Sequence, residues 1–183
     1  MKKILTVFLI IILTTALYGC TQNKDQSATA HAMPVDPNSL PFDFAKSALT
    51  KENIVKALAK VLPEGQITNV TIESNIVTIR YNPGAQWDEK SLVRNSAVKD
   101  VKVFAILHSN PKIEKAALWT QNPITDIKDN KNVEDVMMVT FLRASEKDIN
   151  WSNFEDLVVE DYNKLLNIAD DKYIHPEIAK ALE

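Results

Sequence analysis

Hydrophobic and polar residues alternate along two pairs of segments, and this pattern predicts two β-hairpins. The first pair is 67–72 and 76–81, which are rich in β-branched residues and are separated by three polar residues. The second pair is 113–121 and 136–143, with a polar connection between the two segments. Each predicted strand has one apolar face, so we expect the sheet to be covered on one side.

Helical spacing of apolar residues predicts a helix before each hairpin. Thr50 is a suitable N-cap for a helix over 51–62, whose apolar residues share one face. Asp88 is a suitable N-cap for a longer helix that reaches about Ser109. A helix of this length spans about 30 Å and can cross the back of a small sheet.

Two more helices are predicted after the second hairpin. Ser152 and Glu155 fit a capping box, which opens a helix that runs to about Ala169. Pro176 suits the first position of a last short helix. The element order is therefore α-β-β-α-β-β-α-α, which predicts an α+β fold with a four-stranded, largely antiparallel sheet packed on helices.

The first twenty residues have the pattern of a secretory signal. Lys2 and Lys3 precede an apolar run over 4–13, which is shorter than the roughly 20 residues that span a bilayer. The segment ends Leu17-Tyr18-Gly19-Cys20, which resembles the lipobox of bacterial lipoproteins. The resemblance covers residues 1–20 only. It implies that Leu17 and Gly19 belong to the recognition signal and that residues 1–19 are cleaved off.

The same resemblance implies that the Cys20 sulfur carries a diacylglyceryl group, so the protein would be anchored through lipid at the extracytoplasmic face of a bacterial membrane. A Gram-positive cell membrane and a Gram-negative periplasmic leaflet both stay open. Residues 20–41 are polar, contain three prolines and show no apolar period, which predicts a disordered tether. The single α+β domain then comprises 42–183, a common size for one domain.

Charge and composition exclude several classes of function. The chain has 21 basic and 24 acidic residues, and loss of 1–19 leaves 19 against 24, a net charge of −5. This sign argues against nucleic acid as a partner. Beyond the leader only Gly65 and Gly84 remain, so glycine-rich phosphate loops cannot be formed, and we expect no cofactor. Lipidation of the one cysteine leaves no thiol for nucleophilic catalysis.

Conventional catalytic and metal motifs are also missing from the sequence. His108 is expected to cap the long helix, His175 precedes a proline at a helix start, and neither has a second histidine at metal-ligand spacing. Adjacent acidic residues on a helix diverge by about 100°, so they do not converge on one atom. We expect no metal site and no catalytic residue, although two carboxylates from separate elements could still meet in a cleft.

The candidate binding residues surround the loop between the first hairpin and the long helix. Trp87 follows Gly84 in this loop, where an exposed ring could serve as a platform for a sugar or a protein partner. Tyr81, Arg80 and Arg94 flank it in sequence. The favoured interpretation is a non-enzymatic accessory domain that recognises another envelope protein. The alternative is a small envelope hydrolase that uses two carboxylates.

Overall fold

The computed structural model describes residues 42–125 and 129–183, and its centre is a five-stranded sheet. The strands lie side by side in the order of the sequence. Only β2 and β3 pair in parallel, whereas the other neighbours are antiparallel. The strands are β1 (Ile67–Glu73), β2 (Ile76–Tyr81), β3 (Lys115–Thr125), β4 (Lys131–Leu142) and β5 (Asp171–Ile174).

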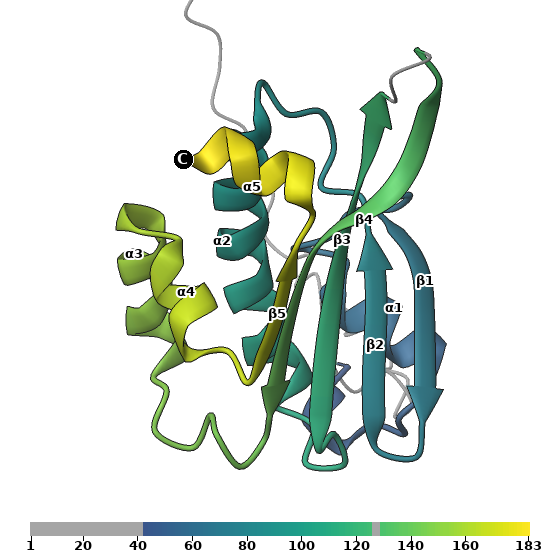
Figure 1. The fold of residues 1–183 in the computed structure, drawn as a ribbon. Helices are drawn as coiled ribbons and strands as arrows, with labels where there is room; N and C mark the ends of the chain where they lie inside the picture. Colours follow the sequence, from purple (N-terminus) through teal and green to yellow (C-terminus); the bar gives the residue numbers. More distant parts are fainter. Residues whose placement is uncertain (1–41, 126–128) are drawn as a thin grey trace, which may run out of the picture. The chain divides into compact units, whose positions relative to one another are not determined.

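The helices of the described residues pack against one face of this sheet (Figure 1). The central helix α2 contacts α1, α3 and α5 as well as β3 and β4. None of the described helices is long and apolar enough to cross a membrane. The helical segments are η1 (Phe44–Lys46), α1 (Lys51–Leu58), α2 (Glu89–Leu107), α3 (Trp151–Glu160), α4 (Asn163–Ile168) and α5 (Pro176–Leu182).

Alternation along the strands divides the sheet into a buried and an open face. The inward residues of β2 and β4 are almost completely buried against the helices, and they are Val77, Ile79, Tyr81, Met137, Val139 and Phe141. The residues between them form the face that carries no helix. On this open face, register places Arg80, Trp119, Met138 and Tyr173 in one row across four strands.

Local signals in the sequence located most elements correctly. The Thr50 hydroxyl accepts from the Asn53 amide, and the Asp88 carboxylate accepts from the Ser91 amide, so both predicted N-caps are confirmed. The two strands of the first hairpin and the proline at the start of α5 are also confirmed. The helix α1 ends at Leu58, four residues earlier than predicted, and a turn follows it.

The prediction of four strands is wrong by one, because 171–174 form the edge strand β5. This segment pairs antiparallel with residues 137–140 of β4. Its four residues show no apolar alternation, and three of them are exposed. The second hairpin is also longer than predicted, since the expected polar connection after Gln121 continues the ladder as far as Thr125 paired with Lys131.

The helix predicted over 152–169 is divided into α3 and α4. Asp161 leaves the helical conformation at φ −147° and ψ 102°, and this residue separates the two helices. The capping box is wrong as well, because α3 begins at Trp151 and the Asn150 side chain accepts from the Asn153 amide. The predicted partner Glu155 instead forms an ion pair with Lys102 on α2, at 3.0 Å.

Candidate functional site

The Trp87 loop, residues 82–88, connects β2 to α2 and presents an unusually exposed indole. The side chain of Trp87 is 98% exposed, more than any other large apolar residue among those described. Tryptophan is usually well buried in folded domains because its ring removes a large apolar area from water. Full exposure therefore needs an explanation in how the loop is built.

Hydrogen bonds hold the first half of this loop in one conformation. The backbone amide of Asn82 donates to the Gln66 carbonyl at 2.8 Å. The Asn82 side-chain oxygen accepts from the Gly84 amide at 2.8 Å. Gly84 has φ +89°, a backbone conformation that favours glycine. The ammonium of Lys99 on α2 donates to the Pro83 carbonyl at 2.9 Å and to Gln66.

The second half of the loop is fastened to the start of α2. The Asn95 side chain donates to Gln86 Oε1 at 2.6 Å, and the Asp88 carboxylate caps the helix at 2.7 Å from the Ser91 amide. Contacts therefore lie on both sides of Trp87 while its own ring packs against nothing. The loop presents this indole on a scaffold that is already ordered.

A hollow of about 470 Å³ lies beside the Trp87 loop. Its walls come from the loop and from β3, which runs parallel to β2 and ends at the same side of the sheet. Amide groups dominate the polar part of this lining, and no carboxylate lines it. The lining residues are Asn82, Gly84, Ala85, Gln86, Asn122 and Pro123.

The structure removes Tyr81 from the candidate binding surface because its ring is completely buried between the sheet and α2. Its hydroxyl donates to Asp100 Oδ1 at 2.8 Å and accepts from the Thr120 hydroxyl. Burial raises the pKa of Asp100 well above its ordinary value, and the bond from Tyr81 opposes that shift. Asp100 Oδ2 and the Ser96 hydroxyl have no hydrogen-bond partner among the described residues.

Arg80 and Arg94 lie on opposite sides of the sheet, so the structure does not bring them together. Arg80 is on the open face, where its guanidinium pairs with Asp135 at 3.0 Å and lies 5.4 Å from the centre of the Trp119 ring. Arg94 is on α2 and donates to the Val159 carbonyl of α3 at 2.9 Å. Of the four predicted binding residues, Trp87 alone forms the exposed site.

A buried pair of titratable side chains lies at the C-terminal end of α2, and it was not predicted from the sequence. His108 Nδ1 contacts a carboxylate oxygen of Glu146, and both side chains are almost inaccessible. Burial, together with the positive charge of Arg143, lowers the pKa of His108 to about 4. Burial raises the pKa of Glu146 to about 7. The backbone amide of His108 caps α2, whereas its imidazole contacts Glu146 instead of the helix end, and the Arg143 guanidinium donates to the His108 carbonyl at 3.0 Å.

Each buried acid has its own hydrogen-bonding partner, and the charge of Asp170 adds to the rise in the pKa of Glu146. Asp100 faces Tyr81 across the core, and Glu146 faces His108, so the two carboxyls with strongly raised pKa occupy separate sites. No group of three or more potential ligands among the described residues could hold a metal ion. The hydrolase interpretation, which requires a pair of converging acids, stays a prediction.

The candidate residues of the leader, Leu17, Gly19 and Cys20, lie outside the described residues.

Comparison of the chain with protein-family models, with curated proteins and with solved structures found no match. The function is therefore inferred from the sequence and from the geometry of the described residues.

Proposed function

We propose that this protein is a bacterial lipoprotein whose folded domain recognises another protein of the cell envelope and catalyses no reaction. Cys20, lipidated and exposed by cleavage of the leader, supplies the anchor, and the Trp87 loop supplies the recognition site. The attached acyl chains explain how an acidic chain would stay at a membrane, because two chains anchor stably where one anchors only marginally.

The observation that carries this proposal is the 98% exposure of Trp87 on a loop fastened at both ends. Tryptophan is among the residues that contribute most binding free energy at protein interfaces. A side chain that is already presented in a fixed geometry loses less conformational entropy on binding. The loop therefore has the two properties expected of an interface anchor.

Site-specific crosslinking in the native cells tests the recognition site. A photo-reactive residue at Ala85, beside Trp87, should capture one defined envelope protein, and Trp87→Ala should reduce the yield by about tenfold. The matched control is the same photo-reactive residue at Leu157, an exposed position on α3. Trp87→Ala should change the free energy of unfolding by less than about 0.5 kcal/mol, because the ring makes no packing contacts.

Two results would contradict the recognition site. One is capture of the same product from position 157 at equal yield, and the other is an undiminished product in Trp87→Ala. Either outcome would mean that contact with the partner does not depend on the Trp87 loop.

Metabolic labelling with palmitate tests the anchor. The wild-type protein should incorporate the label and partition with membranes, whereas Cys20→Ala should do neither, since Cys20 is the only thiol of the chain. Incorporation of label into Cys20→Ala would overturn the lipoprotein assignment.

A further inference from the structure

The strand β1 is an open edge of the sheet. It pairs with β2 on one side only, and Figure 1 shows no element beyond it. Its seven residues include neither proline nor lysine, which natural sheets use to block edge pairing. Its register shifts between Ile67 and Asn69, so the regular part of the edge comprises 69–73. The other edge, β5, has four residues and is followed closely by Pro176. The edge strand β1 is therefore less protected than β5 against pairing with a further strand.

Register identifies the backbone groups that are free on β1. Glu73 and Ile76 close the two-residue turn at Ser74 and Asn75 as a hydrogen-bonded pair. From there, non-hydrogen-bonded and hydrogen-bonded pairs alternate along the two strands. Val70 and Ile72 fall in the non-hydrogen-bonded pairs, and their N–H and C=O groups point away from β2. No backbone group of the described residues outside the ladder bonds to them. This edge offers donors and acceptors for a further strand.

A largely apolar hollow of about 380 Å³ lies next to this edge, between α1 and the start of β1. Val55, on α1, is 44% exposed there although it is a β-branched apolar residue. An added strand would place alternate side chains on the helical side of the sheet, where this hollow can receive one of them. The apolar walls are Val55, Ala59, Leu62, Pro63 and Ile67.

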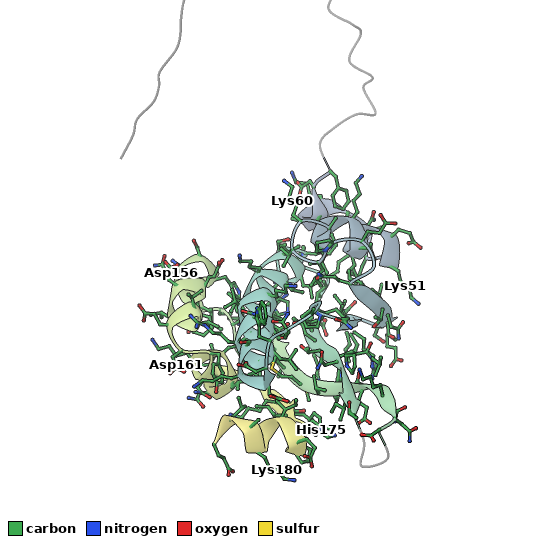
Figure 2. All side chains as sticks on the ribbon, turned by 90° about the horizontal axis from the view of Figure 1, so that it is seen from above. Lys51, Lys60, Asp156, Asp161, His175 and Lys180 are labelled. Atoms are coloured by element: carbon green, nitrogen blue, oxygen red, sulfur yellow. The ribbon has the colours of Figure 1, made fainter. Side chains whose placement is uncertain are left out.

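The segment beside the hollow, 51–64, carries three lysines and two glutamates, whereas the chain as a whole is acidic. Lys51, at the start of α1, and Lys60, just beyond its end, project outward (Figure 2). Lys56 and Glu64 both line the hollow, and the Lys56 ammonium lies 4.4 Å from the centre of the Phe42 ring. Neither Lys51 nor Lys60 forms an ion pair with the described residues. These charges favour a ligand with acidic side chains beside its apolar one.

We propose that β1 and the hollow beside α1 bind an extended peptide segment of another protein by strand addition. The segment pairs with Val70 and Ile72 through its backbone, places one apolar side chain in the hollow and presents carboxylates to the α1 lysines. This surface is separate from the Trp87 loop, so the proposal does not depend on the function proposed above.

Backbone NMR of the chain from residue 20, carrying Cys20→Ala, tests strand addition. The probe is a nine-residue peptide, Glu-Thr-Val-Thr-Leu-Thr-Val-Thr-Glu, with a set in which the central Leu is replaced by Val, Ile, Phe or Trp. Amide signals of Val70 and Ile72 should shift and become slower in hydrogen exchange. Methylation of alternate peptide nitrogens, which removes donors and keeps the side chains, should weaken binding at least about tenfold.

Charged substitutions in the hollow test the side-chain contact. Val55→Glu should weaken binding at least about tenfold, and Leu157→Glu is the matched control because both side chains are 44% exposed. Ala59→Glu serves as a second variant in the same hollow if Val55→Glu lowers stability. Exchanging the terminal Glu residues of the peptide for Lys should also weaken binding.

Three results would overturn this proposal. The methylated peptide could bind as tightly as its parent, the shifted signals could lie away from β1, or no peptide of the set could bind at about 1 mM. Loss of binding in Trp87→Ala with β1 signals unmoved would assign the peptide to the Trp87 loop instead.

Discussion

Glu146 and His108 illustrate, at the scale of single residues, how burial decides the charge of a contact. Removing two charges from water is costly, so a carboxyl and an imidazole that are buried together favour a neutral pair. The raised pKa of Glu146 and the lowered pKa of His108 agree with a carboxylic acid that donates to a neutral ring. The pair joins the end of α2 to the turn after β4.

Replacing Glu146 with Gln should make this protonation measurable as a dependence of stability on pH. Between the ordinary pKa of 4.5 and the folded value of about 7, the folded carboxyl keeps a proton that the unfolded chain releases. The wild type should therefore lose about 1–3 kcal/mol of stability relative to Glu146→Gln as the pH rises through this window, measured by urea unfolding.

His108 provides the internal check on that experiment. Because the pKa of His108 is lowered in the folded protein, the neutral ring stabilises the fold above pH 6.5, the ordinary pKa of histidine. This stabilisation is lost as the pH falls through about 4. Because His108 contacts Glu146, its contribution changes in Glu146→Gln, so the same comparison is repeated in a His108→Gln background. A difference independent of pH would show that the pKa of Glu146 is not raised in the folded protein.

At the scale of elements, most predicted features that depend on neighbouring residues were confirmed, with the Ser152 capping box as an exception, and those that depend on distant contacts were missed. Thr50 and Asp88 bond to amides three residues away, so their caps could be read locally. The strand β5 exists because 171–174 find the edge of β4. The burial of Tyr81 likewise depends on α2, and sequence position alone placed it beside Trp87.

Substitutions at the start of α3 should distinguish the cap in the structure from the one that the sequence indicated. Asn150→Ala should cost about 1 kcal/mol because it removes the acceptor for the Asn153 amide. Ser152→Ala, at an exposed position inside the helix, should cost less than about 0.5 kcal/mol. Chemical denaturation of both variants provides the measurement, and a larger loss in Ser152→Ala would restore the capping box.

At the scale of the whole molecule, α2 joins all parts of the described fold. It connects the parallel neighbours β2 and β3, packs on the sheet and contacts three other helices. Ion pairing of Lys102 with Glu155 and the bond from Arg94 to Val159 attach α3 to it. We therefore expect the sheet and the helical layer to unfold together.

Two proteins with a single tryptophan test this cooperativity. Trp119 reports on the open face of the sheet, whereas Trp151 stacks on Phe104 within the helical layer. When the other two tryptophans are replaced by Phe, the fluorescence midpoint of urea unfolding in each protein should equal the midpoint given by circular dichroism of the same protein. Separate midpoints would mean that the helices leave the sheet before it unfolds.

The direction of α2 also gives the domain two functionally different poles. Trp87 precedes the first turn of this helix, while Asn110, just past its last turn, donates to the Phe44 carbonyl where the described chain begins. Nineteen residues at 1.5 Å each separate these poles by about 28 Å. A partner bound at Trp87 would thus pull on the domain along the axis of its longest helix, with the attachment of the chain at the opposite end.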